Sequence, residues 1–414
     1  MDKILFEKNR KKILDQMEDN SIFVIFSNKT DSDDIFKQSY NINRNFFYAS
    51  GILEYEDILV LTKINGKTTE FIYINEYDEF KSLWVGDYLT KEEVIEKSGI
   101  KDVRYLNNFE SNLSALLSNI NKLYLDLSSE GLSDLLDKTA LFARKIKDKL
   151  PYVNILNGRK LFTHARTVKE PEEIEEMKKA IEITNKGIKN ILSHIGEMYE
   201  YQLESYFDKS VKYNGATGYA FPTIAASGKN ATCLHYMKNN SLAKNGDLIL
   251  FDLGSSLNMY CSDISRTFPI NGKFSERQKI FYNIVLNGQK LVFENAKVGI
   301  TTKELNQILI NYYAVELKRI GLIKEDGEVS KYYYHGVSHH IGLDCHDLCE
   351  YTPLKEGSII SNEPGLYIKE ENIGIRIEDD ILITKNGAVW LSSQILKEVD
   401  EIEDFIKNNK SKEF

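Results

Sequence analysis

The chain has 414 residues, which exceeds the size at which one hydrophobic core usually stops growing, so the sequence predicts two domains. Hydrophobic residues make up 42% of the chain and charged residues 28%, as in an ordinary soluble globular enzyme. The net charge of −9, with no basic cluster that stands clear of acidic neighbours, argues against a nucleic-acid partner.

Strands and helices alternate through the first part of the chain. Residues 57–74 are predicted to form a hairpin around Asn65-Gly66. Thr90 and Glu93 make a capping-box pattern for a helix that ends at Gly99. This alternation predicts an α/β domain over residues 1–165. Further strands are expected at residues 21–26, 122–127 and 152–156, and further helices at residues 109–120 and 132–150.

The pattern changes after residue 159. Residues 159–170 are polar and irregular, and a long amphipathic helix is expected to begin at Pro171, so the domain boundary is placed near residue 165. A second helix is expected at residues 200–213. Two capped helices, a histidine-rich loop and antiparallel strands follow, which predicts an α+β domain over residues 166–414.

One strand in this second domain carries an unexpected charge. Residues 248–253 are apolar except at Asp252, which is the pattern of a strand buried on both faces. A second β-rich run carries Asp263, and a hairpin midpoint between Leu257 and Asn258 would place the two carboxylates directly opposite each other. Like charges this close in a core must share a proton or hold a cation. A half-exposed strand with both carboxylates in water is the alternative.

Three further segments combine polar groups in the same way. Residues 335–347 hold four of the seven histidines, Glu363 precedes a proline, and Arg376 shares one strand face with Glu378 by period-two alternation. Each segment alone is also explained by a solvated strand face or turn. Together, two aspartates, two glutamates and a histidine suit two divalent ions such as Mn²⁺, Co²⁺, Fe²⁺ or Zn²⁺, whose charge balances that of the four carboxylates.

The cysteines and the chain start carry less information. Four cysteines are too few and too irregularly spaced for a disulfide framework. Cys345 and Cys349, with His346 between them, suggest a zinc clip, but the second half of a paired motif is missing. No signal peptide and no run of about 20 apolar residues is visible, so the sequence predicts a cytoplasmic protein with no membrane partner.

The polar segments appear in an order that resembles a known family. The aminopeptidase P and prolidase group of pita-bread metallopeptidases has a similar ordered signature, and residues 39–61 resemble the N-terminal domain of aminopeptidase P. The resemblance implies a C-terminal pita-bread (creatinase/aminopeptidase-like) domain after a smaller α/β domain. The segments that carry it are FPTIAASGKNATCLHY (221–236), FDLGSS (251–256), SDISRTFPING (262–272), HGVSHHIGLDCHD (335–347), NEPGLY (362–367) and GIRIEDD (374–380).

Carried over onto this sequence, the resemblance implies a site with two divalent metal ions, with Mn²⁺ the expected ion and Co²⁺, Fe²⁺ or Zn²⁺ as alternatives. Asp263 and Glu378 would bridge the ions, and Arg376 would lie behind the ligands. The implied metal ligands are Asp252, Asp263, His339, Glu363 and Glu378, and the implied substrate-side histidines are His235, His335 and His346.

The sequence departs from the family pattern at the rim of the implied pocket. His340 stands where an aromatic residue is common, and Glu356 replaces a usual proline before Gly357. The loop between His346 and Glu363 is also a few residues short. The implied ligands are intact.

The resemblance implies hydrolysis of the N-terminal Xaa-Pro bond of peptides, with a metal-bridging hydroxide as the nucleophile. Glu363 would shuttle protons, His235 and His346 would stabilise the carbonyl oxygen, and His335 would shape the proline site. The expected partners are peptides with proline at the second position and further copies of the chain, as a homodimer or higher homo-oligomer.

Three other functions stay open at this point. Prolidase would take only Xaa-Pro dipeptides. Methionine aminopeptidase shares the five ligands but is disfavoured by the N-terminal domain and by the segment Leu234-His235-Tyr236. A peptide-binding pita-bread module without catalysis is disfavoured because all five ligands are present.

Overall fold

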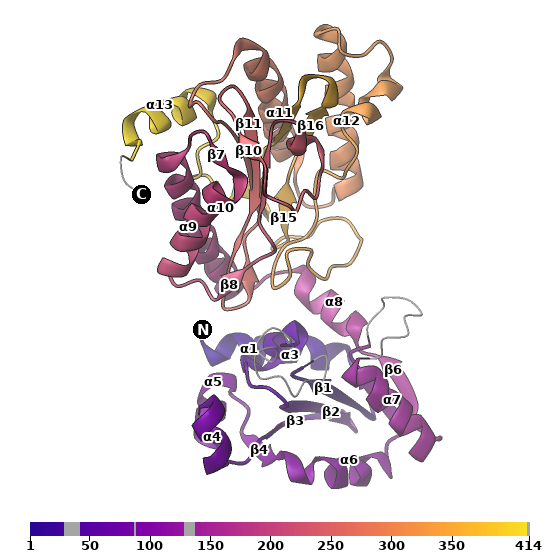
Figure 1. Cartoon of the computed structure of the whole chain (residues 1–414). Helices are drawn as coiled ribbons and strands as arrows, with labels where there is room; N and C mark the ends of the chain where they lie inside the picture. The colour runs from indigo at the N-terminus through magenta and orange to yellow at the C-terminus, as the bar shows by residue number, and fades with distance from the viewer. Residues whose placement is uncertain (29–41, 87, 128–136, 412–414) are drawn as a thin grey trace. The chain divides into compact units, whose positions relative to one another are not determined.

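The computed structural model describes residues 1–28, 42–86, 88–127 and 137–411 (Figure 1). The chain divides into two compact units, Met1–Ala165 and Arg166–Phe414. Among the helices of these described ranges, none is long and apolar enough to cross a membrane. The compartment of the protein stays a prediction from the sequence.

The first unit is built on a six-stranded mixed sheet with the strand order β4-β3-β2-β1-β5-β6. Alternate residues of β1 point to opposite faces: Ile22, Val24 and Phe26 join the core under α6 and α7, while α1 and α3 cover the other face (Figure 1). The elements are β1 (Ser21–Phe26), β2 (Ile58–Ile64), β3 (Lys67–Ile74), β4 (Asp102–Tyr105), β5 (Lys122–Leu125), β6 (Asn154–Asn157), α1 (Lys3–Gln16), α3 (Arg44–Ser50), α4 (Glu79–Val85), α5 (Lys91–Ser98), α6 (Phe109–Leu117), α7 (Lys138–Lys149) and α8 (Arg159–Thr167).

Short-range sequence signals are confirmed in this unit. Asn65 and Gly66 both have positive φ, 49° and 72°, and connect β2 to β3 in a two-residue turn. The capping box of Thr90 and Glu93 forms, and the helix ends at Gly99 in the left-handed conformation. The helix expected at residues 132–150 is α7, and residues 132–136 lie outside the described ranges.

One expectation near the boundary is wrong. The polar stretch after residue 159 was expected to be irregular, yet Arg159–Thr167 forms the helix α8. The apolar side chains of Leu161, Phe162 and Ala165 are buried on one side of it. The helix has nine residues, of which three are apolar and the others are polar or charged, and this short polar stretch explains why it is difficult to detect in the sequence.

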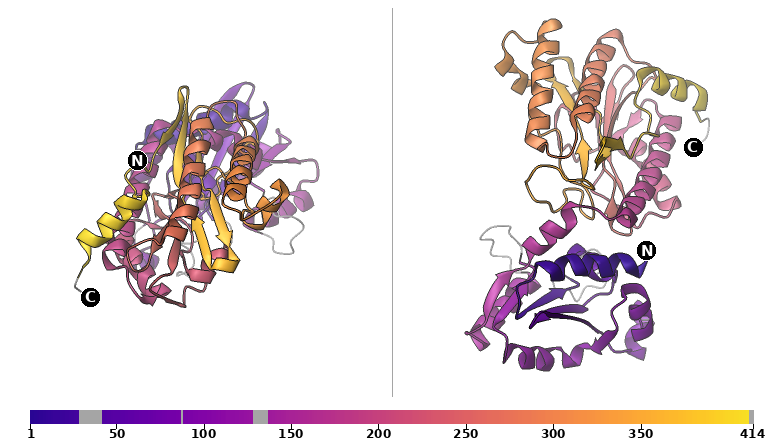
Figure 2. Two further views of the ribbon diagram at one scale, coloured as in Figure 1. Left: turned by 90° about the horizontal axis from the view of Figure 1, so that it is seen from above. Right: turned by 180° about the vertical axis from the view of Figure 1, so that it is seen from behind.

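The second unit consists of small sheets between two pairs of helices. All of its pairings between named strands in the described ranges are antiparallel. Helices α9 and α10 pack on one side of the strands, and α11 and α12 lie on the other (Figure 2). The helices are α9 (Pro171–His194), α10 (Glu200–Tyr213), α11 (Glu276–Asn295), α12 (Thr302–Arg319) and α13 (Val399–Asn409).

The strands of this unit form two-stranded and three-stranded sheets, with orders β10-β7, β14-β11-β9, β13-β12-β8, β15-β18-β19 and β16-β17. They are β7 (Met198–Tyr199), β8 (Gly218–Tyr219), β9 (Ile224–Ser227), β10 (Leu242–Ala243), β11 (Leu248–Leu253), β12 (Ser255–Leu257), β13 (Tyr260–Cys261), β14 (Ile264–Pro269), β15 (Ile359–Asn362), β16 (Gly365–Ile368), β17 (Ile373–Arg376), β18 (Asp379–Thr384) and β19 (Gly387–Trp390).

The register expected for the central hairpin is wrong by one residue at its tip. Leu257 pairs with Tyr260, so the turn consists of Asn258 and Met259, both with positive φ. Asp252 therefore lies opposite Ser265 and not opposite Asp263. A one-residue shift of the midpoint moves the partner by two residues, which leaves Asp263 on the same face of the hairpin, displaced diagonally from Asp252.

Candidate metal centre

Four carboxylates and one histidine from separate segments converge in the second unit. Asp252 is near the end of β11, Asp263 precedes β14, Glu363 follows β15 and Glu378 lies between β17 and β18. His339 stands on the loop before β15, and its Nε2 lies 3.4 Å from Asp263 Oδ2, 3.5 Å from Glu363 Oε1 and 4.0 Å from Glu378 Oε1. The structure thus places three of the predicted carboxylate ligands around His339.

Arg376 and Ser265 hold the carboxylates from behind. Arg376 Nη2 donates to Asp252 Oδ2 at 2.5 Å, Nε donates to Ser265 Oγ at 2.7 Å, and Nη1 donates to Tyr367 Oη at 3.2 Å. Ser265 Oγ in turn lies 3.1 Å from Asp252 Oδ1 and 2.7 Å from Glu378 Oε2. The guanidinium is therefore occupied by partners within the site.

The centre carries an excess of negative charge in a buried place. Burial raises the pKa of Asp252 against the opposing charge of Arg376. Burial also raises the pKa of Glu363 to about 7, although His339 and Arg376 lower it. Glu378 has a pKa well above its usual range because it is buried next to Asp263 and Glu363. The protein atoms alone do not compensate these carboxylates.

His339 responds to the same charges with the opposite sign. Burial disfavours its charged form, but the hydrogen bond and charge of Asp263, together with Glu363, raise its pKa to about 9. Its Nδ1 lies 3.2 Å from the backbone oxygen of His340, which leaves Nε2 directed at the carboxylates. Protonated His339 therefore places a positive charge of the protein itself where a metal cation would otherwise bind.

The donor set fits a divalent cation. One oxygen of Asp263 and of Glu378 and a nitrogen of His339 lie within 4.8 Å of one another. Glu378 Oε1 is buried and has no hydrogen-bond partner among the described residues. A buried carboxylate oxygen without a partner is costly, and a cation held by oxygen ligands and one imidazole removes that cost.

Two of the three predicted substrate-side histidines, His335 and His346, contact this set. His335 Nε2 lies 2.8 Å from Tyr367 Oη, and burial followed by the charge of Arg376 lowers its pKa to about 4. The ring of His346 stacks on His339 with 4.1 Å between ring centroids. His235 is exposed. A positive charge on His235 lowers the pKa of both His335 and His346, and burial and nearer charges have larger effects on these two pKa values. The three residues therefore share one region.

Sequence reasoning missed three residues that position the ligands. Ser265 and Asp380 each lie two positions beyond a predicted ligand, Asp263 and Glu378, so period-two alternation was the signal that could have found them. Asp380 accepts the backbone N–H of Asp263 at 3.3 Å, and burial followed by the charge of Asp263 raises its pKa well above the usual range. Tyr367, which contacts His335 and Arg376, gave no comparable signal.

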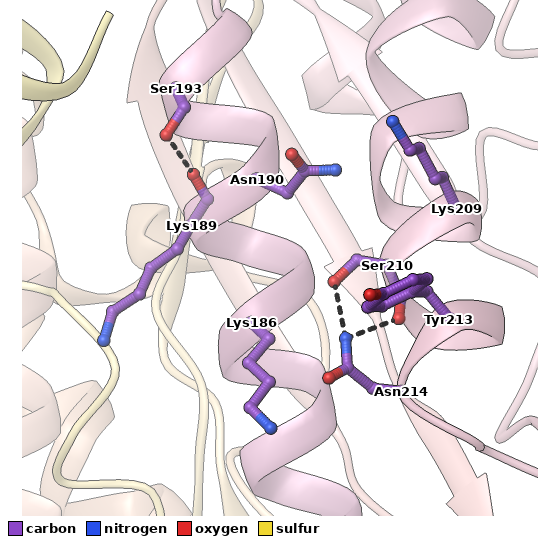
Figure 3. Close-up of a pocket in the computed structure, with 8 residues that line it drawn as sticks. All are labelled: Lys186, Lys189, Asn190, Ser193, Lys209, Ser210, Tyr213 and Asn214. Carbon is purple, nitrogen blue, oxygen red and sulfur yellow. Dashed lines mark hydrogen bonds between the residues drawn. The ribbon is translucent and has the colours of Figure 1, made fainter. Parts of the chain in front are cut away.

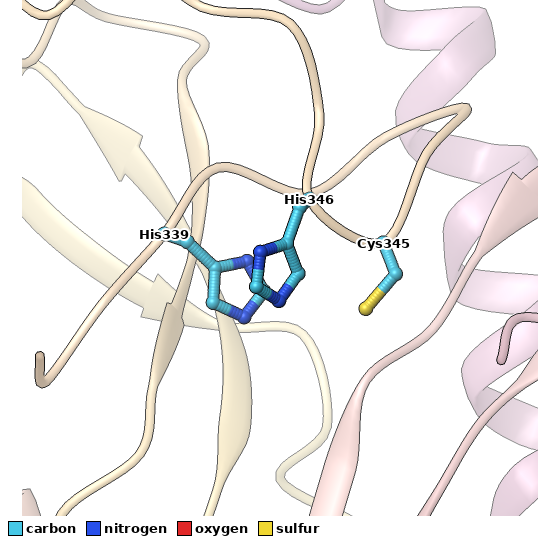
Figure 4. A group of neighbouring side chains, drawn as sticks. All are labelled: His339, Cys345 and His346. Carbon is cyan, nitrogen blue, oxygen red and sulfur yellow. The ribbon is translucent and has the colours of Figure 1, made fainter. Parts of the chain in front are cut away.

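Cys345 and Cys349, which were considered and disfavoured as a zinc clip, do not group around one point. All four cysteines are free. Cys345 groups with His339 and His346, and Cys349 is not part of that group (Figure 4). Cys345 thus belongs to the neighbourhood of the carboxylates.

His340, the unusual residue beside His339, is buried and its backbone bridges Ile360. Burial, followed by the charge of Lys169, lowers its pKa to about 3. The side chain is therefore neutral and part of the packed interior. Glu356, the other substituted position, is about half exposed and 3.7 Å from Lys385.

A separate depression of about 570 Å³ lies between α9 and α10 (Figure 3). Its lining contains three lysines and no residue of the carboxylate cluster. The lining residues are Lys186, Lys189, Asn190, Ser193, Lys209, Ser210, Tyr213 and Asn214.

The fold agrees with comparisons to known proteins. The model of metallopeptidase family M24 matches residues 175–385, and that of the aminopeptidase P N-terminal domain matches residues 6–124. The Xaa-Pro aminopeptidase of Haemophilus influenzae is 30% identical, covering 97% of this chain and 96% of the relative. The Xaa-Pro aminopeptidase of Escherichia coli is 29% identical, covering 96% of each.

Solved structures agree along the whole chain. A Bacillus anthracis protein provisionally assigned as an aminopeptidase P has a TM-score of 0.96 and 44% identity, covering 99% of each chain. Escherichia coli aminopeptidase P in complex with substrate has a TM-score of 0.89 and 28% identity, covering 99% of each chain.

The fold and the site together define a pita-bread metallopeptidase with an additional N-terminal domain. Within that class, the chain belongs to the aminopeptidase P family. This confirms the fold class and the family that the order of motifs predicted.

Proposed function

We propose that this chain is an Xaa-Pro aminopeptidase, a hydrolase that releases the first residue from peptides with proline at the second position. The observation that carries the proposal is the convergence of Asp263, Glu363 and Glu378 on His339, with Asp252 joined to Glu378 through the hydroxyl of Ser265, in a chain of the aminopeptidase P family. Residues 166–414 would form the catalytic domain and residues 1–165 the N-terminal domain.

The cofactor we propose is a pair of divalent ions, with Mn²⁺ as the expected metal and Co²⁺, Fe²⁺ or Zn²⁺ as alternatives. Asp263 and Glu378 would bridge the pair, Asp252 would complete one ion, and His339 and Glu363 the other. When bound, such ions supply positive charge, an activated water molecule and polarisation of the scissile carbonyl. The four carboxylates and the orphaned oxygen of Glu378 support a pair over a single ion, because one divalent ion together with Arg376 would leave one buried carboxylate charge uncompensated.

The remaining residues would bind the peptide and move protons. Glu363 would take the proton from the attacking water and deliver it to the leaving amine. His235 and His346 would donate hydrogen bonds to the scissile carbonyl oxygen as negative charge develops there. His335, held by the hydroxyl of Tyr367, would line the side of the pocket that receives the proline ring.

Arg376 bears on the alternative function, prolidase. A dipeptidase needs a basic group to hold the free carboxylate of its substrate. The Nη2, Nε and Nη1 atoms of Arg376 donate hydrogen bonds to Asp252, Ser265 and Tyr367, respectively, and the side chain is buried. This supports a positioning role for Arg376 and favours an aminopeptidase that accepts longer peptides.

Metal-dependent cleavage is the test of the proposed function. The purified chain is stripped with a chelator, reloaded with Mn²⁺, and assayed on an Xaa-Pro-Yaa peptide, with metal analysis of the active sample. We expect turnover to vanish on chelation and to return with two ions per chain. Full turnover of metal-free protein, or rapid release of methionine from Met-Ala peptides without cleavage before proline, would contradict the proposal.

We also propose that the protein assembles into a homodimer or higher homo-oligomer. The short helix α4 supports this, since Phe80, Leu83 and Trp84 are 70%, 79% and 71% exposed on it, and exposed apolar patches often mark interfaces. Sedimentation analysis of wild type and Trp84→Glu tests the idea. A monomeric wild-type protein at micromolar concentration would rule it out.

A further inference from the structure

Cys345 gives the metal centre a sulfur donor that the proposed reaction does not use. Its thiol lies 2.8 Å from Asp263 Oδ2 and donates a hydrogen bond to it. His339 Nε2 lies 3.4 Å from the same oxygen. The sulfur of Cys345, a soft donor, and His339 of the proposed catalytic set therefore both contact Asp263.

A second histidine completes this arrangement. Figure 4 shows Cys345, His339 and His346 close to one another on the same stretch of chain. One potential donor atom from each lies within 4.8 Å of the other two. Donors around a tetrahedral zinc ion are separated by about 3.3–3.8 Å, so side-chain movements of about 1 Å would close the group around an ion.

We propose that His339, Cys345 and His346, with Asp263 as the fourth ligand, form a second metal site that takes a thiophilic divalent ion such as Zn²⁺ or Cd²⁺. Thiolate and imidazole select such ions, whereas the neighbouring oxygen-rich set suits harder ones. On binding, the sulfur–metal bond replaces the S–H bond and the proton leaves to solvent, without a change of oxidation state. His346 is exposed, which gives an ion access from solvent.

The second site and the catalytic set exclude each other at His339. Nδ1 of His339 faces the backbone oxygen of His340 at 3.2 Å, so Nε2 is the nitrogen left for a metal. One imidazole nitrogen has a single lone pair and binds one ion. This part of the inference rests on the proposed function: filling the thiolate site removes His339 from the catalytic ions and inhibits the peptidase.

Cadmium binding tests the site without any assay of activity. The full-length chain is stripped of metal under reducing conditions and titrated with Cd²⁺ while the ultraviolet sulfur-to-cadmium charge-transfer band is recorded. We expect the band to saturate at one ion per chain, to vanish in Cys345→Ser, and to require about 10-fold or more Cd²⁺ in His346→Ala.

Two cysteine variants serve as matched controls. Cys349→Ser removes a half-buried thiol from the same loop that is outside the donor group, and Cys233→Ser removes an exposed thiol. Both should keep the band. A band that persists in Cys345→Ser, or that disappears in Cys233→Ser, overturns the site.

Competition is tested separately on Mn²⁺-loaded protein. Zn²⁺ or Cd²⁺ is added during cleavage of an Xaa-Pro-Yaa peptide, and each rate is divided by the same variant's uninhibited rate. The half-inhibitory concentration should rise about 10-fold or more in Cys345→Ser and stay unchanged in Cys349→Ser. Equal inhibition of wild type and Cys345→Ser contradicts the competition. A chain that shows the cadmium band but cleaves no peptide before proline retains the site and loses the proposed function.

Discussion

Ser265 lies directly opposite Asp252 in the ladder between β11 and β14, and its hydroxyl is 3.1 Å from Asp252 Oδ1. The same hydroxyl is 2.7 Å from Glu378 Oε2 and accepts a hydrogen bond from Arg376 Nε at 2.7 Å. A hydroxyl has one hydrogen, so it donates to one carboxylate at a time while it holds the guanidinium. A neutral residue thus sets the spacing of two carboxylates from different segments.

Ser265→Ala should therefore weaken metal binding while the fold persists. Removing a group that orients metal ligands costs about 10- to 100-fold in metal affinity. The measurement is a Mn²⁺ titration of stripped protein by calorimetry, together with the melting temperature of the metal-free form. Ser358→Ala is the matched control, because Ser358 is equally buried and its hydroxyl accepts a hydrogen bond from the nearby backbone N–H of Lys355. Equal metal affinity of Ser265→Ala and wild type would show that the hydroxyl does not position the ligands.

Asp263→Asn is expected to lower metal affinity by about 100-fold or more, and to leave the metal-free protein at least as stable as wild type above about pH 9, where His339 has lost the proton that attracts it to Asp263. Asp263 is the leading charge that raises the pKa of Glu378 and of Asp380, so its neutralisation removes repulsion from the empty centre. Thermal melts in excess chelator, with metal affinity measured in parallel, test both halves.

The corrected hairpin register changes the reason for this expectation. In the observed register, the variant mainly removes the repulsion of Asp263 with Glu378 and Asp380, and Asp252 is a diagonal neighbour of Asp263. A metal-free Asp263→Asn variant that melts well below metal-free wild type would mean that the bonds of Asp263 to His339 and Cys345 outweigh its repulsion.

The sequence predicted the elements whose signals are local. The turn at Asn65-Gly66 and the capping box of Thr90 and Glu93 depend on a few adjacent residues, and both formed as expected. The turn of the central hairpin did not follow such a rule, because it places Met259 at a φ of 70°, a conformation that side chains other than Gly, Asn and Asp seldom adopt. Its register therefore could not be fixed from composition.

The site could be predicted from the sequence where charged residues interrupt apolar strands. Asp252 and the Arg376–Glu378 face were visible because charged residues interrupt apolar runs. Tyr367 was not, since a tyrosine in a strand is ordinary and its importance comes from which side chains the fold brings to it. Ser265 could be found only by its period-two spacing from Asp263. The contact of Cys345 with Asp263 was not predicted either, because the two residues are far apart in the sequence and close in space.

The metal-free protein should lose stability as pH rises from about 6.5 to about 9. Burial opposes the charge on His339, but Asp263 and Glu363 raise its pKa to about 9, so this residue stabilises the fold fully below pH 6.5 and loses that contribution as pH passes 9. The raised pKa of buried Glu378 acts in the same direction, because the folded chain holds this proton to a higher pH than the unfolded chain does. Melting temperatures across this range in excess chelator give the measurement.

Metal-loaded protein provides the control for this pH series. Divalent ions bind the deprotonated carboxylates and the neutral imidazole, so saturating Mn²⁺ should flatten or reverse the slope. Metal-free His339→Gln should also show a shallower fall. A melting temperature that rises from pH 6.5 to pH 9 without metal would contradict the proton on His339.

The last prediction concerns the length of the peptide. A bond to proline has no N–H, and the Xaa-Pro unit has restricted backbone geometry, so recognition must come from the ring and the free N-terminal amine. The carboxylate of an Xaa-Pro dipeptide would need a basic partner, and Arg376 is buried and bound to Asp252, Ser265 and Tyr367. Xaa-Pro-Yaa tripeptides should therefore be cleaved at the first bond at least as efficiently as Xaa-Pro dipeptides. Values of kcat/KM for matched pairs, such as Ala-Pro and Ala-Pro-Ala, decide the point, because a preference of about tenfold or more for the dipeptide would identify the enzyme as a prolidase.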